Sequence, residues 1–177
     1  MTLVAGVILV QLVSRGQPET GTAGETKIKM KNEVNSNSTR IGNLSANVPD
    51  TWTGIRPSSS MRLMEFRLGV AADDATLAIF KNIGGTIDNN LERWSGQFGY
   101  SLSDSEVNIR AENINGMQVS IISILGTYTN TMAFSDATQP KPNYRLLGAI
   151  AATPDGLYYF KLTGPTTVIT GRLEEFT

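Results

Sequence analysis

The amino-acid sequence predicts an α+β domain: a mainly antiparallel β-sheet with helices packed on it. Three observations lead to this class. Segments that alternate apolar and polar residues outnumber segments with helical spacing. Short turn signals of the hairpin kind, Asn115-Gly116 and Pro154-Asp155-Gly156, join these segments. Two helical stripes are present, so the expected architecture has two helices on a sheet rather than alternating βαβ units.

The first 25 residues are expected to precede the folded domain. Residues 2–13 are almost wholly apolar, but as a helix they would cover about 18 Å, short of the roughly 30 Å hydrocarbon core of a bilayer. Their length fits a secretory signal peptide, although the usual basic start is missing. We expect a signal peptide or short membrane anchor at residues 1–16, with a buried helix or strand as the alternative. Residues 17–25 are expected to be a flexible linker to a single domain at residues 26–177.

Four strands are expected before the first helix. Residues 27–31 alternate lysine with apolar side chains, which is typical of an edge strand. A short strand is expected at residues 41–48, ended by a Pro-Asp turn. Residues 61–68 alternate again, which places Arg62 on the face of the apolar residues and not on the face of Glu65. After the Asp73-Asp74 turn, the apolar run at residues 76–81 predicts a central strand covered on both faces.

Two helices are expected. Gly84-Gly85 ends the central strand, and Thr86 or Asp88 can cap the helix that follows. Its apolar stripe has spacings of four, three and four residues and consists of Ile87, Leu91, Trp94 and Phe98. The second helix starts with Pro165 at its first position, after the preceding strand has stopped. Its apolar residues are Val168, Ile169, Leu173 and Phe176.

Two hairpins complete the expected sheet. The first pairs residues 107–112 with residues 117–128 around Asn115-Gly116, because both turn residues tolerate the positive φ of a type I′ turn. The second pairs residues 144–152 with residues 157–163. Between the hairpins, residues 129–143 contain two prolines and few large apolar side chains and are expected to form a long loop.

Several short motifs between residues 48 and 176 resemble those of a known group of proteins. They are Pro49, Trp52, Pro57-Ser58-Ser59-Ser60-Met61-Arg62, Gly84-Gly85, Asn90, Glu92-Arg93-Trp94, Gln97-Phe98 and Phe160-Lys161-Leu162-Thr163-Gly164-Pro165. The group consists of uncharacterised exported bacterial proteins, hypothetical or lipoprotein-like. It is similar in element order to the PsbP-like fold of extrinsic photosystem proteins and Ran-binding Mog proteins.

The resemblance implies an α/β/α sandwich around an antiparallel sheet, and a role as a non-catalytic accessory or binding domain. It supplies no catalytic residues. This sequence departs from the group in two ways: it has no lipobox cysteine, and it stops at Thr177, inside the expected last helix.

Composition bears on the classes of function. The chain has neither histidine nor cysteine, which removes the side chain that titrates near neutrality and the commonest ligands of transition metals. Fifteen basic residues against 16 acidic ones give a net charge of -1, which disfavours nucleic acid as a partner. No cofactor and no metal are expected.

The candidate binding residues lie between Trp52 and Arg62. Hydrogen-bond donors for a carboxylate or a sugar are supplied by Ser58, Ser59, Ser60 and Arg62. The alternative is that these serines are ordinary residues of a loop. Trp52 is expected in a loop, where it is a candidate for ligand contact. Together with Arg56 and the loop at residues 129–143, these residues form the predicted ligand- or partner-binding surface.

Other chemistries have weaker signals. Gly84-Gly85-Thr86 before a helix can hold an anion, but a tight turn is the simpler interpretation. A serine nucleophile would need a buried lysine as its base, such as Lys81 or Lys161. Three acidic clusters have side chains of the kind used in glycoside hydrolysis or calcium binding, but none has a complete motif. They are Asp73-Asp74, Asp88 with Glu92, and Glu174-Glu175.

We therefore expect an extracytoplasmic bacterial accessory domain, periplasmic or in the cell envelope, that binds an unknown protein or small molecule without catalysis. Membrane association through the N-terminal segment stays open. Two alternatives stay open: a carboxylate-dependent hydrolase acting on glycans, and a structural envelope protein.

Overall fold

A computed structural model describes residues 38–69, 75–129 and 139–171. Nine strands and two helices lie in these ranges. In chain order they are β1 (Ser38–Ile41), β2 (Leu44–Asn47), β3 (Trp52–Ile55), β4 (Arg62–Leu68), β5 (Ala75–Lys81), α1 (Ile87–Gly96), β6 (Val107–Ile114), β7 (Met117–Tyr128), β8 (Lys141–Thr153), β9 (Gly156–Pro165) and α2 (Thr166–Thr170).

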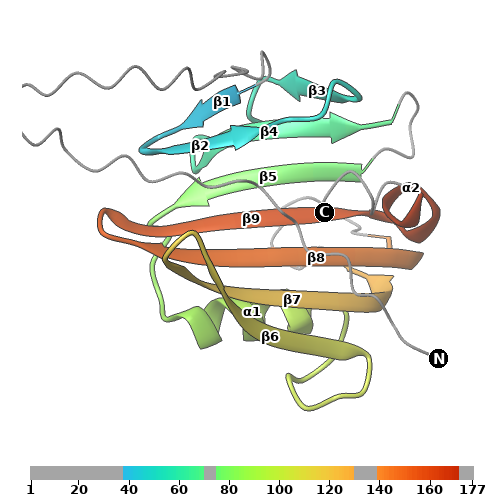
Figure 1. Ribbon diagram of the computed structural model, residues 1–177. Coiled ribbons are helices and arrows are strands. Elements are labelled where there is room, and N and C mark those ends of the chain that lie inside the picture. The colour runs from blue at the N-terminus through green and yellow to red at the C-terminus, as the bar shows by residue number, and fades with distance from the viewer. Residues whose placement is uncertain (1–37, 70–74, 130–138, 172–177) are drawn as a thin grey trace, which may run out of the picture.

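One antiparallel sheet of seven strands organises the chain (Figure 1). The strand order is β3-β4-β5-β9-β8-β7-β6, and β1 and β2 form a separate hairpin. The last strand, β9, lies in the middle of the sheet because it pairs with both β5 and β8. The segment that contains α1 therefore connects the sheet's centre at β5 to its far edge at β6.

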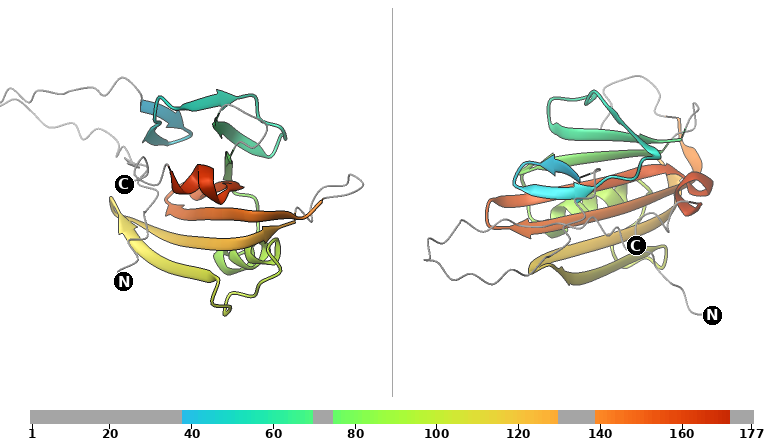
Figure 2. Two further views of the ribbon diagram at one scale, coloured as in Figure 1. Left: turned by 90° about the vertical axis from the view of Figure 1, so that its right-hand side faces the viewer. Right: turned by 45° about the horizontal axis from the view of Figure 1, so that its top comes forward.

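The two faces of the sheet are covered differently, as Figure 2 shows. On one face, α1 buries Leu91 and Trp94 against Ile122 of β7 and Ile150 of β8. On the other face, Tyr158, Phe160 and Leu162 of β9 belong to a core that includes the β1–β2 hairpin and Ile169 of α2. The description is thus a strand-dominated antiparallel α+β fold. The expected α/β/α sandwich is not formed as such in the described residues, since a hairpin and a single helical turn lie where the second helical layer was expected.

Most elements expected from the sequence are confirmed. β5 lies between β4 and β9 with buried residues on both faces. Thr86 caps α1 through a reciprocal capping box with Asn89. The turn between β6 and β7 has positive φ at Asn115 (50°) and Gly116 (82°), as a type I′ turn requires.

Five expectations about single elements need correction. Residues 41–48 do not form one strand, because Gly42 adopts φ of 62° and turns the chain back into the β1–β2 hairpin. Residues 130–138 of the loop expected at 129–143 lie outside the described ranges, and residues 141–143 belong to β8, which begins at Lys141. β9 runs through Gly164-Pro165, so Pro165 is the N-cap of α2 and not its first residue. The last two corrections, the register of β4 and the position of Trp52, are described with the candidate site.

Several expectations concern residues outside the described ranges: the segments 1–16, 17–25 and 27–31, the Asp73-Asp74 turn, Leu173, Phe176 and Glu174-Glu175. In the described part of the chain, no helix is long and apolar enough to cross a bilayer.

Candidate functional site

The site begins with a β-bulge in β4. The register shifts between Arg62, which pairs with Phe80, and Met64, which pairs with Ile79. Leu63 is therefore an extra residue in β4, and it turns Arg62 to the face that α1 covers, which is also the face of Glu65. The predicted alternation, which placed Arg62 and Glu65 on opposite faces, was wrong. Nη1 of Arg62 now lies 2.6 Å from Oε1 of Glu65. Phe66 and Leu68 keep the expected orientation and are buried in the opposite core.

Glu65 is a buried carboxylate with specific partners. Its side chain is 5% exposed, and Ser58 donates its backbone N–H to Oε2 at 2.7 Å. The Ser58 hydroxyl lies 3.5 Å from Oε1. Burial by itself raises the pKa of Glu65, but the hydrogen bonds from Ser58 and the ion pair with Arg62 outweigh it and leave the pKa lowered. The carboxylate therefore stays ionised and fixes the loop from Ser58 to Arg62.

A cleft of about 230 Å³ lies beside this pair. Its floor is made by small side chains of the two central strands, Thr76 and Ala78 of β5 and Thr163 of β9, together with Lys161 of β9. Because α1 packs mainly over β7 and β8, it does not fill the space above these strands. The cleft is thus a consequence of where the helix lies on the sheet.

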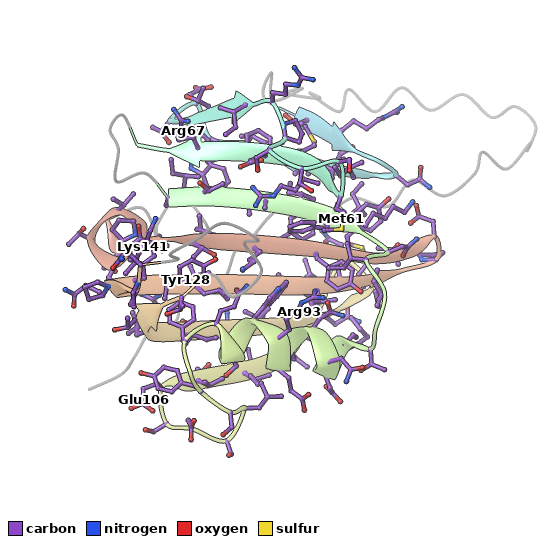
Figure 3. All side chains as sticks on the ribbon, turned by 180° about the vertical axis from the view of Figure 1, so that it is seen from behind. Met61, Arg67, Arg93, Glu106, Tyr128 and Lys141 are labelled. Carbon is purple, nitrogen blue, oxygen red and sulfur yellow. The ribbon has the colours of Figure 1, made fainter. Side chains whose placement is uncertain are left out.

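Aromatic rings and cations form the walls. Tyr128 and Tyr144 stack with their ring centroids 5.9 Å apart and their planes 9° from parallel. Each ring faces a cation: Nζ of Lys161 lies 5.6 Å from the Tyr128 centroid, and Nζ of Lys141 lies 5.5 Å from the Tyr144 centroid. Figure 3 shows Tyr128 and Lys141 at the same end of the sheet strands. On the β4 side, the Arg62 guanidinium lies 5.9 Å from the Phe80 centroid.

Lys161 is held at the base of the cleft. Its Nζ donates a hydrogen bond to Oε1 of Gln97 at 2.5 Å, and the backbone carbonyl of Gln97 accepts the N–H of Thr129 at 2.7 Å. Gln97, the C-cap of α1, thereby joins the helix end, the end of β7 and β9. Burial, with smaller contributions from the charges of Arg62 and Arg93, lowers the pKa of Lys161 to about 7.

Thr163 adds a polar group whose hydrogen bonding is incomplete. Its hydroxyl oxygen is buried and has no hydrogen-bond partner within the described residues. Buried hydroxyls are normally paired, so this one fits a site that a polar ligand or water completes. The cleft therefore combines cations, stacked rings and an unused hydroxyl, which is the equipment for binding a small anion.

The predicted site residues divide between the two faces. Ser58 and Arg62 meet at Glu65, as described. Trp52, expected in a loop, is the first residue of β3, and it is 9% exposed. It packs on the core of the opposite face, with its ring centroid 6.4 Å from that of Phe66. The expected loop position of Trp52 is therefore corrected to the start of a strand, with its ring packed in the core.

The other predicted residues serve the loop or are exposed. Ser59 accepts the N–H of Met61 at its hydroxyl and the N–H of Arg62 at its carbonyl. Arg56 and Ser60 are exposed and are not part of the cleft lining. Some cleft residues were not expected in any site: Glu65, Thr76, Ala78, Phe80, Tyr128, Tyr144 and Thr163. Lys141 lies within residues 129–143 of the predicted surface, and Lys161 was expected only as a candidate base for a serine. The one available signal was Lys161, a cation inside the apolar run of β9.

The weaker chemical signals have structural roles. Gly84 and Gly85 adopt positive φ at the entry to α1, and Asn90 donates its side-chain amide to the carbonyls of Gly84 and Thr86. Asp88 and Glu92 are exposed on α1. Within the described ranges, no group of three or more acidic side chains is placed to hold a metal ion.

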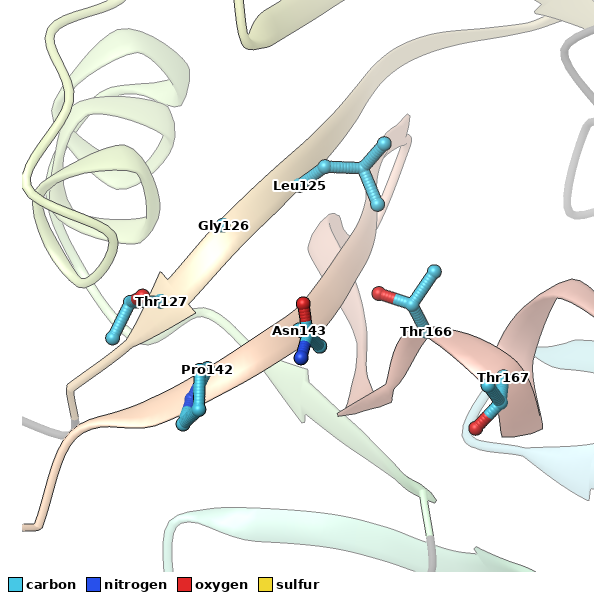
Figure 4. Close-up of a pocket in the computed structure, with 7 residues that line it drawn as sticks. All are labelled: Leu125, Gly126, Thr127, Pro142, Asn143, Thr166 and Thr167. Atoms are coloured by element: carbon cyan, nitrogen blue, oxygen red, sulfur yellow. The ribbon is translucent and has the colours of Figure 1, made fainter.

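A second hollow lies where β7 ends and β8 begins (Figure 4). Its volume is about 510 Å³, and its lining consists of Leu125, Gly126, Thr127, Pro142, Asn143, Thr166 and Thr167. None of these side chains is charged. This hollow offers mostly apolar surface, and its polar side chains are the three threonines and Asn143.

Comparisons with known proteins give little further information. No protein-family model matches the chain, and no curated protein sequence matches it. Among solved structures, it is similar to the solution structure of cyanobacterial PsbP (CyanoP) from Synechocystis sp. PCC 6803. The sequence identity is 14% and the TM-score 0.43, over 73% of this chain and 78% of that chain. This similarity is too low to assign a family or a function.

Proposed function

We propose that this chain is a non-catalytic binding domain that takes a small carboxylate in the cleft between β4, β9 and the stacked tyrosines. The observation that carries the proposal is the convergence of Arg62, Lys141 and Lys161 on a cleft whose described lining holds one acidic residue, Glu65. Glu65 is already satisfied by Arg62 and Ser58. The charge balance of the lining therefore favours an anion over a cation or a neutral ligand.

The donors suit a carboxylate. A guanidinium has five N–H donors, more than the single short bond from Arg62 to Glu65 uses, and it matches the planar geometry of a carboxylate. Lys141, on the opposite wall, supplies a second charge. A volume of about 230 Å³ is below the range of drug-sized sites, which favours a ligand the size of a small metabolite. The parallel rings of Tyr128 and Tyr144 favour a ligand with a flat or apolar part.

The test is a titration followed by NMR chemical shifts, with benzoate as the probe and benzyl alcohol as the neutral control. Benzoate is expected to shift amides of β4, β9 and the end of α1, more strongly at low salt than at high salt because the contact is electrostatic. Arg62→Gln and Lys141→Gln are expected to weaken binding several-fold. Arg56→Gln, a change of the same kind at an exposed arginine outside the cleft, is the matched control and should leave it unchanged. Equal shifts from the neutral probe, or equal losses in all three variants, would overturn the proposal.

The proposal includes the location expected from the sequence. The apolar segment at residues 2–13 supports export to the bacterial cell envelope. Determining the N-terminal residue of the protein isolated from its native host tests this, and an intact Met1 in a cytoplasmic fraction would contradict it.

The glycan-hydrolase alternative has no observation in its favour. It requires two carboxyl groups across one cleft, the acid of the pair with a raised pKa. In the described cleft lining the acidic residue is Glu65, and its pKa is lowered.

A further inference from the structure

Lys161 is more than a charge at the base of the cleft. It lies in the central strand β9, at the same level as Ala78 of β5 and Gly148 of β8, so its backbone is fixed on both sides. Gln97 holds its Nζ at 2.5 Å. The backbone around Lys161 is rigid, and the hydrogen bond fixes the position of the side-chain nitrogen.

On the premise that the cleft is the binding site proposed above, we infer that the Lys161 amine forms a reversible imine with a carboxylate ligand that also carries an aldehyde or ketone. The ligand class is that of small oxo acids. Two features of the geometry point to it. Lys161 lines a cleft that admits a small molecule, and the cations Arg62 and Lys141 lie on separate walls, where they can hold the ligand's carboxylate beside it.

The surroundings of Nζ favour the reactive, neutral amine. The charged groups that line the cleft around it or act on it are Arg62 and Glu65 from β4, Arg93 from α1 and Lys141 from β8, and the titratable rings are Tyr128 and Tyr144. Burial and the two arginine charges bring the pKa of Lys161 to about 7. A substantial fraction of the amine is therefore neutral at physiological pH, whereas an ordinary lysine is almost fully protonated. A neutral amine still has two N–H donors, so it keeps its bond to Gln97 while its lone pair becomes available.

The chemistry needs no co-reactant. The nitrogen lone pair forms a bond to the carbonyl carbon as the π electrons move to oxygen, and proton transfer gives a carbinolamine. Loss of the hydroxyl group together with the remaining nitrogen proton forms the C=N bond and releases one water. Nothing is oxidised or reduced, and hydrolysis reverses the reaction. The unpartnered hydroxyl of Thr163, two residues along the same strand, lies on the same cleft floor to bind the departing oxygen.

The experiment is reductive trapping of the full chain with glyoxylate and sodium cyanoborohydride at pH 7, read by intact mass and by peptide mapping. The expected result is a first adduct at Lys161, formed at least ten-fold faster than at the other lysines and slowed by excess benzoate. Lys161→Arg is expected to abolish the fast adduct. The matched variant Lys81→Arg, at a lysine outside the cleft lining, should keep it.

Mapping of the unmodified protein tests the inference even if Lys161→Arg does not fold. Uniform labelling of the lysines, or a fast adduct at a residue other than Lys161, overturns the inference. The two proposals fail separately. If benzoate binds the cleft but Lys161 is not labelled preferentially, only the imine is wrong; if benzoate does not bind either, the anion site is wrong as well.

Discussion

The indole ring of Trp94 occupies the space that a side chain at Gly148 would need. A Cβ built on Gly148 would lie 2.4 Å from Cζ3 of Trp94 and 2.7 Å from a methyl group of Ile122. The helix α1 thus packs directly on the backbone of β8. This contact fixes the helix over one half of the sheet, and the other half is left with the small side chains that floor the cleft.

Gly148→Ala tests that contact. The added methyl group has no room, because both the helix and the sheet must shift to admit it. We expect a loss of roughly 1–3 kcal/mol in the free energy of unfolding, measured by urea denaturation. Gly96→Ala, at the last residue of α1, is the matched control. A Cβ there meets nothing within 4 Å, so alanine should stabilise the helix by about 0.5–1 kcal/mol. Equal effects of the two changes would show that the contact is not tight.

Tyr158→Phe tests how the β1–β2 hairpin is attached. The Tyr158 hydroxyl accepts the N–H of Asn43 at 3.2 Å and donates to Asp155 at 3.0 Å. Removing the hydroxyl leaves the ring in the core but breaks both bonds. The expected cost is about 1 kcal/mol of global stability. Hydrogen exchange should accelerate at the hairpin amides and not in α1; an unchanged rate at Asn43 would contradict this attachment.

The sequence contains most of the fold but only part of the site. Local patterns determine the elements that were predicted correctly, such as the Thr86 cap and the Asn115-Gly116 turn, because the residues concerned are neighbours in the chain. The cleft depends on partners far apart. Lys161 and Gln97 are separated by 64 residues, and no local pattern indicates that they meet.

The wrong predictions also concern features that depend on more than the local sequence pattern. A single extra residue in β4 moved Arg62 to the other face, and simple alternation cannot indicate where a bulge lies. Trp52 was expected in a loop because it follows a proline-containing turn, but it starts an edge strand, and its own side chain is buried. Ser58 could be proposed for a site because it lies in a loop. Its partner, the Glu65 carboxylate, could not be inferred, because the same sequence also fits a strand with Glu65 on an exposed face.

Asp155→Asn is expected to change the stability in acid. Hydrogen bonds from Lys81, Thr153 and Tyr158 lower the pKa of Asp155 to about 2, from an ordinary value of 3.8. A carboxyl group whose pKa is lowered by folding stabilises the protein above its unfolded pKa, and this contribution disappears as the pH falls toward the folded pKa. The stability advantage of the wild type over Asp155→Asn should therefore be full at pH 5 and shrink between pH 4 and pH 2. Urea denaturation across this range measures it; a constant difference would mean that Asp155 is not stabilised by these partners.

Lys161→Met is expected to stabilise the protein, in contrast to Asp155→Asn. The folded protein lowers the pKa of Lys161 from 10.5 to about 7, chiefly by burial. Between these two values the unfolded chain binds more protons than the folded one, so the wild type gains stability as the pH rises. Below pH 7 the buried charge carries its full cost, and the variant, which keeps the apolar stem but lacks the ammonium, should be the more stable protein. Its advantage should narrow steadily from pH 7 to pH 10, measured by urea denaturation of both proteins at each pH. A difference independent of pH would indicate that Lys161 stays charged in the fold, and it would also remove the neutral amine on which imine formation depends.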